Sequence, residues 1–170
     1  MIHLPYIFLL LFLSIFCELL FGSYGIIIPF TAIIIFYLTM IYNLKIGIIL
    51  AVIAGFLLEI LYARTFYISP ITLSFISIFS VFWLHKGVVK GIHLQMLPGG
   101  IVSFIYTFPI LLINYFLYES GLIIFFTNIL VLLGAIIFGA VLLPITILLL
   151  DTINIKLKIN LYADSKKRIS

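Results

Sequence analysis

Charged residues are scarce in this chain. Only 8% of its 170 residues are Asp, Glu, Lys or Arg, whereas 66% are hydrophobic. A soluble domain of this length needs many more charged side chains to cover its surface. The scarcity therefore excludes a water-soluble fold and indicates an integral membrane protein. The length suits one domain with roughly six membrane spans of about 20 residues each.

Cysteine and recognisable catalytic motifs are scarce as well. The single cysteine, Cys17, lies in an apolar segment and cannot form an internal disulfide. The histidines His3, His85 and His93 have no partner at metal-ligand spacing, and the sequence contains neither a phosphate-binding loop nor a His-Glu-x-x-His motif. We therefore expect no catalytic residues, no metal and no cofactor, and we do not expect nucleic acid as a partner.

Glycine, proline and the few charged residues divide the chain into six apolar segments. These segments run from Leu4 to Phe21, Ile26 to Tyr42, Ile46 to Tyr62, Ser69 to Leu84, Leu97 to Tyr118 and Leu122 to Leu150. They do not alternate polar and apolar positions as the strands of a membrane β-barrel must. Helices satisfy their own backbone within the bilayer. The sequence thus predicts an all-α integral membrane protein, a single bundle of about six transmembrane helices over residues 1–155, followed by a basic cytoplasmic tail over residues 156–170.

The last apolar segment is longer than a membrane requires. As a straight helix it would measure about 40 Å, whereas the hydrocarbon layer is about 30 Å thick. We therefore expect this helix to tilt, to bend or to leave the membrane early. Pro144 favours a bend, because its ring removes a backbone donor and clashes with the preceding turn.

Basic residues gather on one side of the six-span arrangement. Its ends and its second and fourth connections hold eight of the nine Lys and Arg residues, and only Arg64 falls on the other side. Cytoplasmic segments are enriched in these residues, so both termini are predicted to be cytoplasmic. A five-span alternative would divide the basic residues more evenly. The cytoplasmic basic rim, which either marks topology alone or contacts anionic lipid or a cytoplasmic protein, includes Lys86, Lys90, Lys166, Lys167 and Arg168.

Small residues recur at every fourth position of the third segment. Gly47, Ala51 and Gly55 form a stripe that ends at Glu59. Small side chains at this spacing allow another helix to approach closely, and an ionisable residue in a span is a candidate functional residue. Two interpretations stay open. Glu59 either binds a partner or small ligand, or it pairs with Arg64 or reaches the outer headgroups while the stripe packs inside the bundle.

Two further sets of residues are candidates for binding. Glu18 lies near the outer end of the first segment, and it either shares an outer cavity with Glu59 or is solvated at the interface. Ala135 and Gly139 form a second pair of small residues at i+4 spacing, in the last segment. This pair serves either as an oligomer contact, such as a homodimer, or as packing within the bundle.

A distinctive stretch joins the third and fourth segments. It reads Gly55-Phe56-Leu57-Leu58-Glu59-Ile60-Leu61, followed by a short polar turn and an apolar run from Ile68 through Pro70 to Trp83. This stretch resembles the central signature of the bacterial rod shape-determining MreD family. In that family a glycine, two or three apolar residues and an acidic residue, usually aspartate, end one helix, and a short turn opens the next.

The resemblance implies a non-enzymatic scaffold of the cell-wall elongation machinery in the bacterial inner membrane. Such a protein would regulate cell shape by binding the membrane protein MreC, the actin-like MreB and peptidoglycan synthases, and Gly55 and Glu59 are the two residues carried over. The alternative is a substrate-capturing membrane subunit of an energy-coupling vitamin transporter. Those subunits commonly have alanines at i+4 spacing on the first helix, whereas Leu4 to Phe21 contains no alanine. An enzyme of lipid or wall-precursor processing is a third hypothesis.

Overall fold

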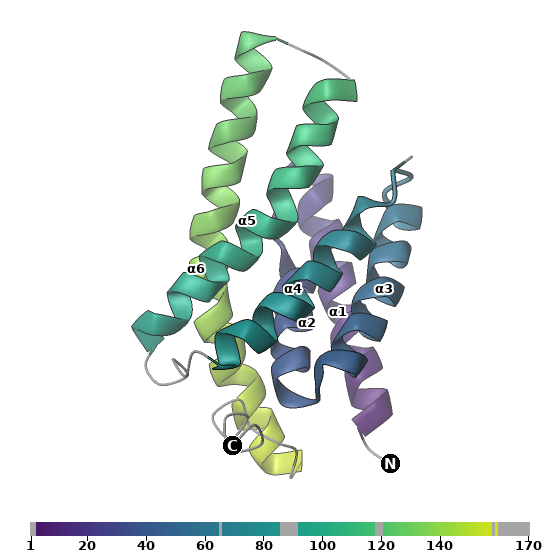
Figure 1. The fold of residues 1–170 in the computed structure, drawn as a ribbon, viewed down its shortest axis with the longest axis vertical. Helices are drawn as coiled ribbons and strands as arrows, with labels where there is room; N and C mark the ends of the chain where they lie inside the picture. Colours follow the sequence, from purple (N-terminus) through teal and green to yellow (C-terminus); the bar gives the residue numbers. More distant parts are fainter. Residues whose placement is uncertain (1–2, 65, 86–91, 118–120, 158, 160–170) are drawn as a thin grey trace.

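The described part of the chain forms a bundle of six helices in a computed structural model. The structure describes residues 3–64, 66–85, 92–117, 121–157 and 159, and within them it contains no strand. Successive helices run in opposite directions, so that the start of the first and the end of the last lie at one end of the bundle, the lower end in Figure 1. The helices are α1 (His3–Ser23), α2 (Phe30–Ile41), α3 (Leu44–Leu61), α4 (Ile68–His85), α5 (Ile92–Leu117) and α6 (Leu122–Leu157).

Five of these helices are long and apolar enough to cross a membrane, which makes the chain a multi-pass membrane protein. The exception is α2, whose 12 residues would measure about 18 Å, less than the roughly 30 Å of hydrocarbon. The sequence predicted a longer segment from Ile26 to Tyr42, and this boundary was wrong. The helix begins only at Phe30, because Pro29 occupies the N-cap position and disfavours a helical conformation in the residue before it.

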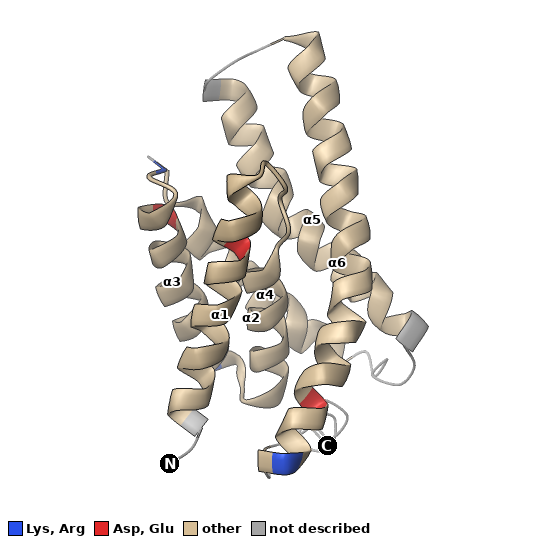
Figure 2. Ribbon diagram, turned by 180° about the vertical axis from the view of Figure 1, so that it is seen from behind, with Lys and Arg blue, Asp and Glu red and all other residues tan. Residues whose placement is uncertain are grey.

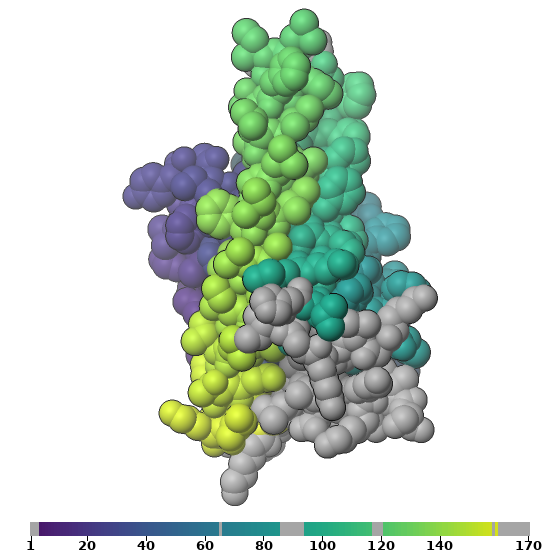
Figure 3. Space-filling view, turned by 90° about the vertical axis from the view of Figure 1, so that its left-hand side faces the viewer, coloured from purple at the N-terminus to yellow at the C-terminus, as the bar shows by residue number. Residues whose placement is uncertain are grey.

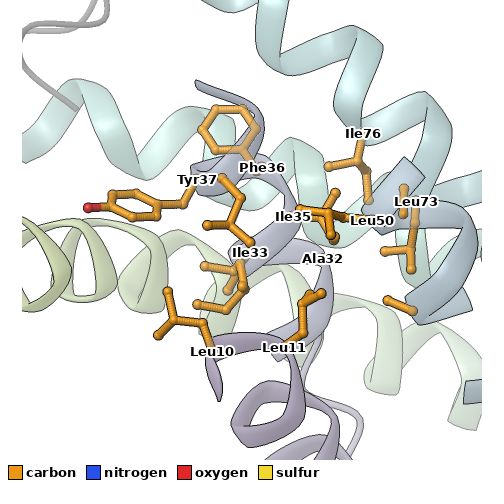
Figure 4. Close-up of a cluster of buried hydrophobic side chains, with 14 of the residues drawn as sticks. Leu10, Leu11, Ala32, Ile33, Ile35, Phe36, Tyr37, Leu50, Leu73 and Ile76 are labelled. Carbon is orange, nitrogen blue, oxygen red and sulfur yellow. The ribbon is translucent and has the colours of Figure 1, made fainter. Parts of the chain in front are cut away.

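The short helix α2 forms the centre of the core. All its residues from Thr31 to Ile41 are buried, and it contacts each of the other five helices. Figure 4 shows Ile33 and Ile35 of this helix among Leu10 and Leu11 of α1 and Leu73 of α4. A helix that is hydrophobic on every side belongs in the interior of a bundle, so the longer helices shield α2 from its surroundings.

Helices α5 and α6 form a long pair that extends beyond the other helices at the upper end (Figures 1 and 3). The two helices approach closely at Gly139, where an added Cβ would lie 2.8 Å from the carbonyl oxygen of Gly99 and would overlap the side chain of Ser103. Ala135, one turn earlier, is also buried. The small pair predicted in the last segment therefore lies within this chain, against α5.

Helix α6 runs for 36 residues and passes through Pro144 without interruption. Its length corresponds to about 54 Å, and it continues beyond Leu150, where the predicted apolar segment ended. It includes the first two residues of the predicted tail, up to Leu157.

Charged residues are few on the described helices, as Figure 2 shows. Lys45 at the start of α3 and Lys156 in the last turn of α6 belong to the lower end, whereas Arg64 follows the end of α3 at the upper end. The five residues named for the predicted basic rim lie outside the described residues. They are Lys86, Lys90, Lys166, Lys167 and Arg168.

Candidate functional site

Glu59 caps the start of the helix that follows it. Its side chain is 1% exposed, and its Oε1 accepts a hydrogen bond of 2.7 Å from the backbone N–H of Ser69, the second residue of α4. The first N–H groups of a helix have no acceptor within the helix, and a carboxylate there also interacts favourably with the helix dipole. Glu59 therefore fixes the start of α4 to the end of α3.

Gly55 brings the same two helices into close contact one turn earlier. A Cβ at this position would overlap the backbone of Pro70 and would lie 2.9 Å from its Cγ. Only glycine allows the backbone of α3 to approach this closely. Gly55, Glu59, Ser69 and Pro70 thus form one buried unit, which we call the α3–α4 joint.

Arg64 does not pair with Glu59 in the described part of the chain. Its Nη1 donates to Ser69 Oγ at 3.4 Å, and its guanidinium lies 4.4 Å from the centre of the Tyr62 ring. The sequence left open an ion pair between Glu59 and Arg64. In the structure the Glu59 carboxylate instead accepts a hydrogen bond from the backbone N–H of Ser69. The reason is geometric, because the chain turns back immediately after α3 and presents the free N–H groups of α4 to the carboxylate.

The rest of the small-residue stripe lies against α2 and α4. At Gly47 an added Cβ would lie 2.8 Å from the Cβ of Thr39 in α2, and Ala51 is fully buried. The stripe of Gly47, Ala51, Gly55 and Glu59 is therefore an internal packing face of the bundle.

Glu18 caps α2 in the way that Glu59 caps α4. Its side chain is 5% exposed, and its Oε2 accepts a hydrogen bond of 3.0 Å from the backbone N–H of Thr31, the second residue of α2. Its Oε1 accepts a second bond, of 2.5 Å, from the hydroxyl of Tyr106 in α5. A second tyrosine contacts its backbone: the Tyr62 hydroxyl donates to the Glu18 carbonyl oxygen at 3.0 Å. Glu18 thus connects α1, α2, α5 and the end of α3.

A cavity of about 240 Å³ lies beside Glu18 at the upper end of the bundle. Its polar lining consists of Glu18, Tyr62, Arg64 and Tyr106, and the chain around residues 22–28 covers part of it. Glu59 is not among its lining residues. The two carboxylates therefore do not share this cavity, because that of Glu59 is turned towards the start of α4. We call this space the Glu18 cavity.

A second polar cluster at the lower end was not anticipated from the sequence. The Tyr37 hydroxyl donates to Asp151 Oδ1 at 2.8 Å and accepts from Asn154 Nδ2 at 2.8 Å. Tyr37 and Asn154 are fully buried, so this cluster ties the core helix α2 to the end of α6. Tyr37 is 114 positions from Asp151 and 117 from Asn154, and no motif marks the three residues.

The comparisons with known proteins identify no relative. Neither models of protein families, nor curated proteins, nor solved structures match this chain.

Proposed function

We propose that this chain is a non-enzymatic scaffold of the bacterial cell-wall elongation machinery that regulates cell shape by holding partner membrane proteins in place. The observation that carries the proposal is the α3–α4 joint. Gly55 and Glu59, on which the resemblance to the MreD family depends, are both buried in it. The motif therefore fixes the positions of two helices. This is consistent with a scaffold, which acts by coupling the binding of one partner to the binding of another.

The proposed orientation crosses the inner membrane six times with both termini in the cytoplasm. The lower end, with Lys45 and Lys156, would face the cytoplasm, in accordance with the positive-inside rule. The short α2 would cross together with residues 26–29, which precede it and lengthen the segment beyond the helix. Backbone that is not helical is tolerated at membrane depth where protein covers it, and Ile28 and Pro29 are buried.

Cysteine labelling tests this orientation on described residues. In a Cys17→Ser background, a membrane-impermeant maleimide should label Arg64→Cys in intact cells and should label Lys45→Cys only after the cells are opened. Labelling of Lys45→Cys from outside would contradict the orientation.

Partner capture tests the scaffold itself. In a rod-shaped bacterium that encodes this protein, we expect a single-span coiled-coil protein of the MreC type to co-purify with it, and we expect depletion to give round cells. Gly55→Leu should reduce co-purification more than Glu59→Gln, because leucine forces the backbones of α3 and α4 apart. Rods that keep their shape on depletion would count against the scaffold.

One observation favours the second candidate, a substrate-capturing subunit of a vitamin transporter. The Glu18 cavity is enclosed by several elements and has charged side chains in its lining, as a small-molecule site commonly has. Tight co-purification of a vitamin with the protein would favour this candidate over the scaffold.

A further inference from the structure

Two opposite charges line the Glu18 cavity without contacting each other. Glu18 is nine-tenths buried or more, and Arg64 is half-buried. Both belong to the cavity lining, yet no ion pair joins them among the residues that the structure describes. Buried charges in proteins are normally paired or hydrogen-bonded, and a polar group bound in the cavity that both residues line would compensate their charges.

Both charged groups retain hydrogen-bonding capacity towards the cavity. A carboxylate offers about four lone-pair positions, and Glu18 uses one on each oxygen, for Thr31 and Tyr106. A guanidinium carries five N–H donors, and within the described part of the chain the guanidinium of Arg64 donates one hydrogen bond, to Ser69. The cavity therefore offers carboxylate acceptors to an ammonium group and guanidinium N–H donors to an anion.

We propose that the Glu18 cavity binds a small zwitterion, with a primary ammonium group at Glu18 and a phosphate or carboxylate group at Arg64. A planar guanidinium suits phosphate and carboxylate oxygens. The hydroxyl groups of Tyr62 and Tyr106 donate to Glu18, and their oxygens keep lone pairs that can accept from further N–H groups of the ligand. Two sources share this chemistry, the headgroup of phosphatidylethanolamine and a free amino-phosphate or amino acid.

A zwitterion fits better than an ion of either sign. A lone cation would leave Arg64 uncompensated beside it, and a lone anion would lie beside the buried Glu18 carboxylate, which costs free energy in a low dielectric. A bound metal ion has less support, since the described residues contain no cluster of three His, Cys, Asp or Glu side chains. The cavity volume, about 240 Å³, is slightly below the lower limit of about 300 Å³ for sites of drug-sized ligands, which is consistent with a small ligand.

This inference goes beyond the proposed scaffold and does not depend on its partners. The closing experiment uses the purified chain alone, so its failure leaves partner capture and cell shape as separate tests. Conversely, loss of partner capture would not affect ligand retention by the isolated protein.

The lipid arm of the experiment uses delipidated protein in nanodiscs that contain equal amounts of two lipids, with retained lipid measured by native mass spectrometry. Phosphatidylethanolamine should be retained about tenfold over phosphatidylcholine, the effect expected of one charge-assisted hydrogen bond, because the choline nitrogen has no N–H to donate. Phosphatidylethanolamine should likewise exceed phosphatidylglycerol. Preference for phosphatidylglycerol would indicate an anion site and would overturn the proposal.

The soluble arm uses O-phosphoethanolamine with the same delipidated protein in detergent. A rise in melting temperature that saturates with O-phosphoethanolamine, and that ethanolamine or phosphate alone does not produce, supports a free zwitterion. Lipid selectivity without this rise supports the lipid headgroup. The absence of both effects overturns the proposal.

Variants distinguish a loss of ligand binding in the cavity from a general loss of protein stability. Glu18→Gln should abolish the preference for phosphatidylethanolamine over phosphatidylcholine, and Arg64→Gln should lower retention of both lipids, because both carry the phosphate. Glu59→Gln, which changes a buried carboxylate outside the cavity, should keep both retention and preference. Arg64 lies outside the helices, so its variant is expected to fold even if Glu18→Gln does not. Equal loss in Glu59→Gln and Arg64→Gln, at unchanged melting temperature, would also overturn the proposal.

Discussion

The α1–α2 and α3–α4 hairpins use the same device in different surroundings. In each, a buried glutamate near the end of one helix accepts a hydrogen bond from the second residue of the next, at 3.0 Å for Glu18 with Thr31 and at 2.7 Å for Glu59 with Ser69. Within a membrane the first N–H groups of a helix must be satisfied by protein. The two glutamates supply these acceptors and thereby fix both turns at the upper end.

The difference between the two caps lies in what the second carboxylate oxygen meets. For Glu18 it accepts from Tyr106, and the side chain borders a cavity. For Glu59 the Oε2 atom is buried without a hydrogen-bond partner among the described residues, and the close contact of Gly55 with Pro70 closes the joint. The same cap is therefore a sealed structural element in one hairpin and part of an accessible polar site in the other.

The largest expected loss of stability comes from Gly55→Leu, which forces the two helices of the α3–α4 joint apart. The new side chain would overlap the backbone of Pro70, which cannot move without shifting α4, so we expect a loss of about 3 kcal/mol in the free energy of unfolding. Unfolding in mixed micelles at increasing dodecyl sulfate measures this loss. Gly134→Leu is the matched control, because a Cβ there meets no atom within 4 Å. Equal losses in the two variants would mean that the α3–α4 joint is not closely packed.

The second-largest loss of stability is expected from Glu18→Gln. Both oxygens of Glu18 accept hydrogen bonds, from Thr31 and Tyr106, and an amide has only one oxygen to accept with. One donor must then face the amide NH₂, and an unsatisfied buried donor typically costs 1–3 kcal/mol, so we expect a loss of about 2 kcal/mol. The same micelle titration measures it. A loss below that of Glu59→Gln would contradict the distinction between the two caps.

A smaller effect is expected from Tyr106→Phe. The phenyl ring keeps the packing of this buried residue, and Glu18 keeps its bond with Thr31, so only one of the two bonds to the carboxylate is lost. We expect about 1 kcal/mol. Tyr24→Phe is the control, since Tyr24 is 81% exposed. An equal loss in this control would show that the hydroxyl of Tyr106 contributes nothing specific.

The sequence predicted the helical membrane bundle and several of its close contacts. Hydrophobic runs bounded by glycine and charge located the helices well, and i+4 spacing of small residues indicated the packing faces at Gly55 and Gly139. These signals are local, because they depend on residues within one or two turns of each other. They also singled out Glu59 as a candidate functional residue, although neither interpretation of it from the sequence included its hydrogen bond to the start of α4.

The partners of the buried polar residues could not be predicted. Glu18 and Tyr106 are 88 positions apart and Tyr37 and Asp151 are 114 apart, so nothing in either segment specifies the other. The short α2 was misjudged for a related reason. Hydropathy alone does not reveal that the residues before Pro29 leave the helix, since isoleucine is equally apolar in either conformation.

The smallest effect is expected from Glu59→Gln, and it is the sharpest test of the comparison. Within the part of the chain that the structure describes, Oε1 of Glu59 accepts a hydrogen bond from Ser69, while Oε2 has no partner. A glutamine amide can keep its oxygen at Ser69 and place its NH₂ where Oε2 lies, so the variant loses mainly the attraction between the carboxylate and the helix dipole, about 0.5 kcal/mol. Micelle unfolding should therefore rank Glu59→Gln below Tyr106→Phe. A loss of 2 kcal/mol or more, the magnitude expected for a buried charge-assisted bond, would mean that charge holds the α3–α4 joint together and that the two caps are alike.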